Sequence, residues 1–281
     1  MRIASFEHLT RPGFGPVEAD HVTDVSAAFP GVVLADLLAI PDYVAQIAQA
    51  ASAAPRLALA AITLLPPIPN PNRIICVGLN YNKHIAEMGR DPGNHPAIFL
   101  RYPDSIVGHA QPLIRPRESD HYDFEGEFAL VIGQGGRRIA VADALQAIAG
   151  YTIFNDGSLR DWQAHSSQFT PGKNFYRSGA CGPWMVTKDA LPNPSASTLR
   201  TRLNGEIMQQ AGLDDLRFPV PFLIEYLSKI FPLLPGDIIA TGTPGGVGAG
   251  RTPKLWMKPG DRIEIEIDGL GTLSNPVTAE D

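Results

Sequence analysis

Residues 121–133 read HYDFEGEFALVIG, in which a charged segment runs directly into an apolar one. Side chains alternate between the two faces of a β-strand, so Glu125 and Glu127 would lie on the same face where a buried strand begins. Two like charges side by side repel each other. A divalent cation between them would relieve that repulsion, whereas a solvent-facing strand edge would explain the pair without any ligand.

Short apolar runs separated by turn residues recur along the chain after residue 73. They are IICVGL (74–79), AIFL (97–100), YTIFND (151–156), PWMVT (183–187), DIIATG (237–242) and DRIEIEI (261–267). This pattern predicts a strand-dominated α+β fold and not a regular βαβ alternation. A helical period is clear in VADALQAIAG (141–150), where Val141, Leu145 and Ile148 share one face and Gly150 closes the predicted helix.

The first part of the chain differs in pattern from the rest. RIASF (2–6) predicts a short strand, and PDYVAQIAQAASAA (41–54) predicts a helix. The run LLPPIPNPNR (64–73) cannot sustain a helix or a central strand because of its prolines. We therefore expect a small α+β N-terminal domain, residues 1–68, and a larger domain, residues 69–281.

Composition limits the kinds of partner. The chain has 281 residues and a net charge of −6, and it contains no Lys/Arg-rich run, so it lacks the positive surface that nucleic acids and anionic membranes need. No apolar run reaches membrane-spanning length, and MRIASFEHL at the N-terminus does not resemble a signal peptide. Cys76 and Cys181 lack metal-binding or redox spacing, which predicts reduced thiols. We expect a cytoplasmic protein.

A third carboxylate follows the apolar run YTIF, at Asp156. Carboxylate oxygens without a histidine among them suit Mg²⁺, Mn²⁺ or Ca²⁺ better than Zn²⁺. Arg160, Gln163 and Lys173 come within 17 residues of Asp156. Two cations and an amide donor so close to the carboxylates could hold an anionic ligand beside a metal ion. The alternative is that the glutamates face solvent and Asp156 caps a turn.

Eight segments, taken in order, resemble the fumarylacetoacetate hydrolase superfamily. They cover roughly residues 70 to 277 and read GLNYNKHIAE, DFEGEFALVIG, GYTIFNDGSLRDWQ, TPGKNF, GPWMVT, LNGE, LLPGDIIATGTPGGVG and KPGDRIEIEIDGLGTLSNPV. The resemblance implies a catalytic domain built as a mixed β-roll or β-sandwich, preceded by a small N-terminal domain. It also implies a homodimer.

The resemblance further implies roles for individual residues. The metal ligands would be Glu125, Glu127 and Asp156, with Mg²⁺ or Mn²⁺ as the usual ion and Ca²⁺ as an alternative occupant. Catalytic roles fall to His84, Glu87 and Lys173, and substrate contacts to Arg160, Gln163, Gly242 and Thr243. Gly157 stands where many members carry a larger residue, which predicts a different pocket beside the metal.

Two of these assignments are also compatible with the residues themselves, which leave simpler alternatives open. His84 and Glu87, three positions apart, would be neighbours on a helical turn, where the carboxylate could orient an imidazole that takes a proton from water. A surface pair would have the same spacing. TGTPGGVGAG (241–250) lacks the lysine and the spacing of a phosphate-binding loop, but a glycine-rich loop can still present backbone N–H groups to an anion.

The resemblance implies a divalent-metal-dependent hydrolase. It would cleave a carbon–carbon bond in a β-dicarbonyl acid, such as an acylpyruvate or a fumarylacetoacetate-like compound, through a metal-bound enolate. The same residues could instead serve an isomerase of 2-hydroxymuconate-type dienoic acids or a decarboxylase of a 2-oxo diacid such as oxaloacetate. A non-catalytic, metal-stabilised binding protein is a further alternative. The substrate would be a small anionic oxoacid.

The segment FPVPFLIEYLSKIFPLL (218–234) bears on assembly. It carries more apolar and aromatic residues than one helix face needs, so part of it would be buried against a second copy of the chain. An ordinary core helix is the alternative.

Overall fold

The computed structural model describes residues 1–82 and 93–281. Its main sheet has the order β4-β3-β2-β1-β14-β12-β11-β17-β6-β7, with β5 paired to β1 and β8 paired to β14. The strands of this sheet are β1 (Arg2–His8), β2 (Arg11–Glu18), β3 (His21–Thr23), β4 (Arg56–Ala58), β5 (Thr63–Leu64), β6 (Ile74–Gly78), β7 (Ala97–Arg101), β8 (Ile106–Val107), β11 (Gly126–Ile132), β12 (Ile148–Asn155), β14 (Gly179–Thr187) and β17 (Ile238–Ala240).

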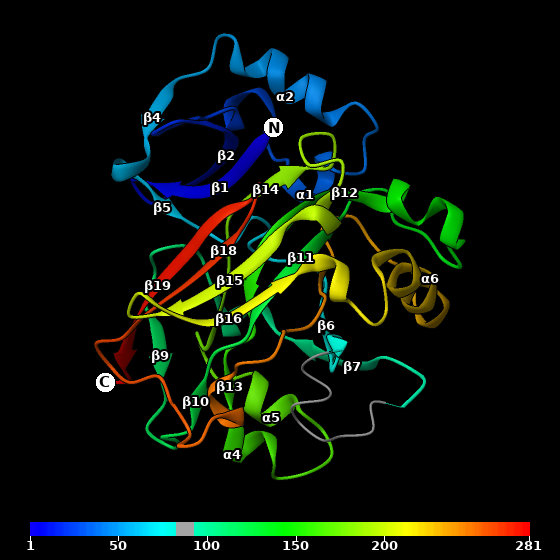
Figure 1. The fold of residues 1–281 in the computed structure, drawn as a ribbon. Helices are drawn as coiled ribbons and strands as arrows, with labels where there is room; N and C mark the ends of the chain where they lie inside the picture. The colour runs from blue at the N-terminus through cyan, green and yellow to red at the C-terminus, as the bar shows by residue number, and fades with distance from the viewer. Residues whose placement is uncertain (83–92) are drawn as a thin grey trace.

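A second sheet has the order β16-β15-β18-β19-β9, and β10 pairs with β13 as a short separate ribbon. These strands are β9 (Leu113–Arg115), β10 (Tyr122–Asp123), β13 (Ser158–Leu159), β15 (Thr198–Leu203), β16 (Glu206–Gly212), β18 (Arg262–Ile267) and β19 (Gly271–Ala279). Figure 1 shows the second sheet lying across the central strands of the first. The predicted mixed β fold with a small N-terminal region is confirmed.

The helices are short and lie outside the sheets. They are α1 (Leu34–Leu37), α2 (Tyr43–Ala51), α4 (Arg160–Gln163), α5 (Thr170–Lys173) and α6 (Val220–Ile230), with 3₁₀ turns η1 (Ser26–Ala28), η2 (Leu59–Ala61), η3 (Pro103–Ser105), η4 (Val141–Ala147), η5 (Pro194–Ala196), η6 (Leu213–Asp215) and η7 (Gly248–Gly250). In Figure 1 the N-terminal strands and α2 occupy one end of the molecule, and α4 and α5 occupy the other. No helix in the described ranges is both long and apolar enough to cross a membrane.

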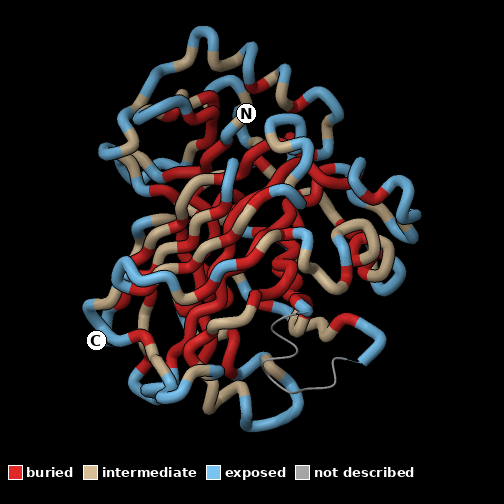
Figure 2. Tube along the Cα trace, viewed as in Figure 1, coloured by how far each residue is buried: buried red, intermediate tan, exposed pale blue. Residues whose placement is uncertain are grey.

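Strand β11 is buried on both faces, which explains why its sequence is continuously apolar after Glu127. Phe128, Leu130 and Ile132 pack into the cluster shared with the second sheet. Ala129 and Val131, on the opposite face, pack with residues of the N-terminal region. Figure 2 shows the buried positions concentrated in these central strands. Glu127 shares the face of Ala129 and Val131, so the apolar layer leads directly into the acidic cluster.

The N-terminal region continues the main sheet because β1 pairs antiparallel with β14. Residues 65–73 form neither helix nor strand, as the proline-rich run predicts. The boundary between residues 68 and 69 falls in this segment and stays a prediction. Cys76 and Cys181 are both buried and free, in agreement with the predicted reduced thiols.

The predicted helix over residues 141–150 is wrong in extent and orientation. The segment forms the 3₁₀ turn η4 and then enters β12, in which Gly150 is an interior position. Val141 and Leu145 are 50% and 53% exposed. The reason is the close approach of β14: a Cβ on Gly150 would lie 2.4 Å from the Val186 carbonyl oxygen. The glycine therefore permits strand pairing there and does not close a helix.

Helix α6 explains much of the apolar segment 218–234 without a second chain. Leu223, Ile224 and Leu227 are fully buried in the chain's own core. Phe218, Phe222 and Tyr226 form a continuous row of stacked rings along the helix. The homodimer stays a prediction.

Candidate active site

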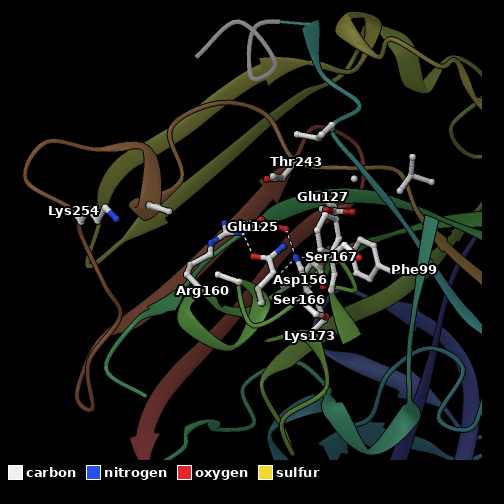
Figure 3. A pocket seen from close by; sticks show the side chains of 17 residues that line it. Phe99, Glu125, Glu127, Asp156, Arg160, Ser166, Ser167, Lys173, Thr243 and Lys254 are labelled. Atoms are coloured by element: carbon white, nitrogen blue, oxygen red, sulfur yellow. Dashed lines mark hydrogen bonds and ion pairs between the residues drawn. The ribbon is translucent and has the colours of Figure 1, made fainter. Parts of the chain in front are cut away.

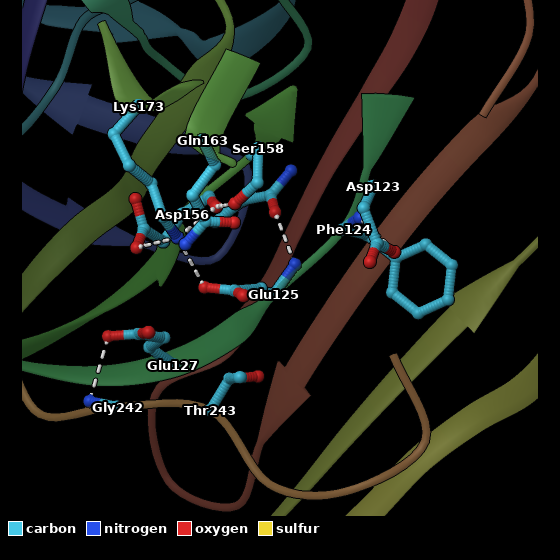
Figure 4. Close-up of polar contacts among 12 residues, drawn as sticks. Asp123, Phe124, Glu125, Glu127, Asp156, Ser158, Gln163, Lys173, Gly242 and Thr243 are labelled. Carbon is cyan, nitrogen blue, oxygen red and sulfur yellow. Dashed lines mark hydrogen bonds and ion pairs between the residues drawn. The ribbon is translucent and has the colours of Figure 1, made fainter. Parts of the chain in front are cut away.

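The three predicted carboxylates converge because of the pairing between β11 and β12. Glu125 immediately precedes β11 and Asp156 immediately follows β12, and the register places Gly126 opposite Asn155. The Asp156 amide donates to the Glu125 carbonyl oxygen at 2.9 Å. Glu125, Glu127 and Asp156 are buried, and each offers an oxygen atom within 4.8 Å of the others. Figure 4 shows them grouped on one side of the sheet.

The ammonium group of Lys173 lies between two of these carboxylates. Its Nζ is 2.6 Å from Glu125 Oε2 and 2.6 Å from Asp156 Oδ2 (Figure 4). Burial would lower the pKa of Lys173, but the attraction of Asp156 and Glu125 outweighs burial, so the net pKa is raised. Lys173 is therefore an ammonium ion in the site and a donor, not a base.

Arg160, which begins α4, pairs with the other oxygen of Glu125 at 2.6 Å. Burial would raise the pKa of Glu125, but Arg160 and Lys173 lower it to about 2. Gln163 accepts a hydrogen bond from Arg160 through Oε1 at 2.9 Å, and its NH₂ group donates to no residue in the described part of the chain. Arg160, predicted to contact substrate, and Lys173, predicted to be catalytic, thus also favour the ionised form of Glu125.

Arg101 is a site residue that the sequence did not reveal. It is 2% exposed, and its NH1 group lies 2.7 Å from Asp156 Oδ1. NH1 also donates to the Gly157 carbonyl oxygen, and the other two nitrogens donate to Ser105 and Ser178. A single arginine at the end of the strand FLR carries no sequence signal for this contact, because it arises only when β7 and Asp156 meet in the fold.

Glu127 differs from the other two carboxylates in having no ion pair with a described residue. Its Oε2 accepts a hydrogen bond from the Gly242 amide at 2.9 Å. Burial, Asp156 and Glu125 together raise the pKa of Glu127 well above its usual range. No described cation forms an ion pair with Glu127, and the all-oxygen donor set of the three carboxyl groups is the one that Mg²⁺ and Mn²⁺ prefer. The acidic triad is therefore consistent with a divalent metal site.

Asp123 is a second residue that the sequence analysis missed. Its carboxylate is fully buried, accepts from Arg160 Nε at 2.8 Å, and also accepts from the amides of Gly248 at 2.7 Å and Ala249 at 3.0 Å. A sequence signal for Asp123 was available, because Asp123, Glu125 and Glu127 stand at alternate positions, which share one face of a strand. The glycine-rich loop does present its N–H groups to anions, and those anions include the protein's own Glu127 and Asp123 carboxylates.

A pocket of about 550 Å³ opens above the acidic cluster. Its lining, drawn as sticks in Figure 3, consists of Val77, Gly78, Leu79, Phe99, Glu125, Glu127, Asp156, Arg160, Gln163, Ala164, Ser166, Ser167, Phe169, Lys173, Thr243, Ala249 and Lys254. Thr243 faces this pocket, whereas Gly242 contributes its amide to Glu127. A substrate contact by either stays a prediction.

Gly157 lies behind the pocket, and the predicted difference from members with a larger residue stays a prediction. A Cβ at this position would lie 1.9 Å from the Ser178 carbonyl oxygen, and Gly157 is not among the lining residues. The glycine allows a close backbone contact behind Asp156. His84 and Glu87 lie outside the described residues, so their roles stay predictions.

Comparisons with known proteins identify the family. The family model described as fumarylacetoacetate (FAA) hydrolase, C-terminal, matches residues 73–278. The chain is 37% identical over 287 residues to a mitochondrial oxaloacetate tautomerase, fahd2, of Xenopus laevis, covering 99% of this chain and 90% of that protein. It is 43% identical over 224 residues to the oxaloacetate tautomerase YisK of Bacillus subtilis (strain 168), covering 78% and 74% of the two chains.

A solved structure extends the comparison to the whole fold. The maleylpyruvate hydrolase of Sphingobium sp. SYK-6, in complex with manganese(II) ion and pyruvate, aligns with a TM-score of 0.83 at 28% identity over 100% of both chains. These matches favour an enzyme over a non-catalytic binding protein. The chain belongs to the fumarylacetoacetate hydrolase family.

Proposed function

We propose that this enzyme interconverts the keto and enol forms of a small 2-oxo diacid of the oxaloacetate class. The observation that carries the proposal is the placement of Lys173 Nζ, 2.6 Å from both Glu125 and Asp156 in the floor of the pocket. Two relatives that are 37% and 43% identical bear the name oxaloacetate tautomerase, which supports the isomerase alternative over carbon–carbon hydrolysis.

Keto–enol interconversion moves one proton between carbon 3 and the oxygen on carbon 2. Removal of the carbon-bound proton develops negative charge on that oxygen, so the rate depends on groups that stabilise this charge in the transition state. Lys173 is suited to this role because it is buried, charged and held by two carboxylates. The ammonium has three N–H donors; two donate to the Glu125 and Asp156 carboxylates at 2.6 Å, and the third makes only a long 3.4 Å contact with the Asp156 carbonyl oxygen, which a substrate oxygen would replace.

Arg160 and Gln163 would orient the carboxylate next to the oxo group. Arg160 is fixed by Glu125 and Asp123, and Gln163 keeps an NH₂ group that can donate to a ligand. A divalent cation held by Glu125, Glu127 and Asp156 would supply Lewis acidity at the oxo end of the substrate. Thr243 lines the same pocket.

The experiment follows the ultraviolet absorbance of enol-oxaloacetate as it converts to the keto form. We expect purified protein with Mg²⁺ or Mn²⁺ to accelerate the decay over the same buffer with metal alone, and EDTA to remove the acceleration. Lys173→Met should lose roughly two orders of magnitude or more, the usual cost of removing one donor to a developing oxyanion. A decay rate equal to that of metal in buffer would refute the proposal.

Carbon–carbon hydrolysis is a second candidate, supported by the full-length similarity to a maleylpyruvate hydrolase. It requires water activation in addition to charge stabilisation, and the predicted base for that step is His84, oriented by Glu87. Incubation with acylpyruvates, with product acids measured by chromatography, separates hydrolysis from tautomerisation. Pyruvate formation from oxaloacetate would report decarboxylation in the same samples.

A further inference from the structure

The cations that line the pocket are not equivalent. Arg160 is paired with Glu125 and Asp123, and Lys173 is paired with Glu125 and Asp156. Lys254 also lines the pocket, yet none of the described carboxylates forms an ion pair with it. Its Nζ lies 6.0 Å from the centre of the Trp256 ring. Among the described lining residues, Lys254 is therefore the cation whose charge is left for a ligand.

Lys254 lies at the end of the pocket away from its apolar wall. Figure 3 shows Lys254 on one side of the acidic cluster and Phe99 on the other. Val77, Leu79 and Phe169 belong to the apolar part of the lining, where a carboxylate would lose its hydration without compensation. Ser166 and Ser167, in contrast, are polar lining residues. A second carboxylate on the substrate is therefore better accommodated beside Lys254 than against these apolar residues.

The loop that carries Lys254 is fixed to the floor of the pocket. Asp123 holds the Gly248 and Ala249 amides and, through its other contact, Arg160. The Leu255 amide donates to the Gly248 carbonyl oxygen at 3.1 Å, and the Met257 amide donates to the Tyr122 carbonyl oxygen at 2.8 Å. The backbone on both sides of Lys254 is thus held by Asp123 and by strand β10, to which Asp123 belongs. The same carboxylate holds Arg160.

The backbone before and after Lys254 lies close together, and this close approach depends on one glycine, Gly248. A Cβ on Gly248 would lie 1.8 Å from the Leu255 carbonyl oxygen. On the outer side, Trp256 packs against His121 with ring centres 5.0 Å apart. These contacts restrict the position of the Lys254 backbone. The flexible side chain still allows the ammonium group to adjust to a bound ligand.

We propose that Lys254 binds the second carboxylate of the substrate and so sets a preference for 2-oxo diacids over 2-oxo monoacids. This inference rests on the proposed function, because it assumes that the oxo end of the substrate occupies the acidic cluster. The protein's own carboxylates already pair with Arg160 and Lys173, so a dianion gains most from Lys254, with which no described carboxylate forms an ion pair. Lys254 acts on binding and selectivity, not on the proton transfer.

The test compares Lys254→Met, Lys254→Arg and the wild type on matched substrates. Oxaloacetate and 2-oxobutanoate differ by a methyl group in place of the second carboxylate. We expect Lys254→Met to raise KM for oxaloacetate roughly tenfold, since one charge-assisted hydrogen bond to a partly solvated donor is lost. The kcat should stay within about twofold, and deuterium exchange into 2-oxobutanoate should be unchanged. Lys254→Arg should restore most of the oxaloacetate affinity.

Lys258→Met is the matched control. Lys258 is an exposed lysine four residues further along the same segment and does not line the pocket, so its replacement should leave KM unchanged. The proposal is overturned if Lys254→Met and wild type discriminate equally between the diacid and the monoacid.

A binding measurement separates this inference from the proposed reaction. Malate and lactate are the reduced, non-enolisable counterparts of oxaloacetate and pyruvate, and calorimetry with Mg²⁺ present compares them directly. If no oxaloacetate turns over but wild type prefers malate and Lys254→Met does not, the proposed reaction fails and the role of Lys254 stands. If wild type binds malate no more tightly than lactate, the role of Lys254 is refuted.

Discussion

Replacement of Arg101 by methionine tests whether this buried guanidinium supports the metal-binding carboxylates. Its NH1 group lies 2.7 Å from Asp156 Oδ1 and 3.0 Å from the Gly157 carbonyl oxygen. Its NH2 group donates to Ser178 Oγ and the Ser105 carbonyl oxygen, and its Nε donates to Ser105 Oγ. A guanidinium has five N–H donors, and this one forms five hydrogen bonds.

The magnitude follows from burial. Arg101 is 2% exposed and Asp156 is 1% exposed, so water cannot replace the lost guanidinium. Removal of one partner from a buried ion pair costs roughly 3–5 kcal/mol when the remaining charge is left uncompensated. Lys173 still pairs with Asp156 Oδ2 at 2.6 Å, so we expect the lower end of this range. Methionine retains much of the apolar stem, which keeps the cavity contribution small. A typical domain has only about 5–15 kcal/mol of stability, so this loss is a large fraction of it.

The assay is urea unfolding in EDTA, followed by tryptophan fluorescence, with the m-value checked for an unchanged unfolding transition. Mg²⁺ affinity should also fall by about 10-fold to 100-fold, the usual effect of losing a residue that supports a metal ligand. Arg200→Met is the control, since Arg200 pairs with Asp268 at the surface and its loss should matter much less. A loss below about 1 kcal/mol for Arg101→Met would show that Arg101 does not stabilise Asp156.

Four further outcomes are expected. Wild type should bind one divalent cation and gain thermal stability with Mg²⁺ or Mn²⁺ by mass action; equal Mg²⁺ affinity in Glu125→Ala, by calorimetry, would remove Glu125 from the site. The pKa of Glu127 is raised in the folded protein, so the metal-free fold loses stability as pH rises through that pKa. A cation binds the ionised carboxylate and therefore displaces a proton from Glu127. Mg²⁺ affinity measured at several pH values should therefore fall on acidification, and a pH-independent affinity would contradict this. His84→Ala should lose acylpyruvate hydrolysis by roughly two to four orders of magnitude, the usual contribution of a general base, with solvent deuterium exchange into a bound oxoacid less affected; hydrolysis at the wild-type rate would make His84 and Glu87 a surface pair. Light scattering should show a homodimer at micromolar concentration, against which a purely monomeric profile would count.

The sequence alone determined the strand-dominated fold and the acidic triad, because both depend on short-range regularities. Alternation along FEGEFALVI predicted the orientation of Glu125 and Glu127, and the carboxylate at the end of YTIFND needed only the return of the chain beside that strand. The resemblance of eight ordered segments supplied the family, and the family model matches residues 73–278. The same alternation would have revealed Asp123.

Only the tertiary structure decided which charges compensate one another. Arg101 reaches Asp156 across 55 positions of sequence, and Asp123 reaches the Gly248 amide across 125. No local pattern encodes such contacts, because they arise from strand order and from loops that meet in space. For the same reason the helical period at residues 141–150 was overridden, since Gly150 lets β12 approach β14. Lys254 is a lone lysine in a loop, and it became a candidate for substrate binding only because the fold places it in the pocket lining with no ion pair to a described carboxylate. Solvation and ion pairing depend on neighbours that the sequence does not specify.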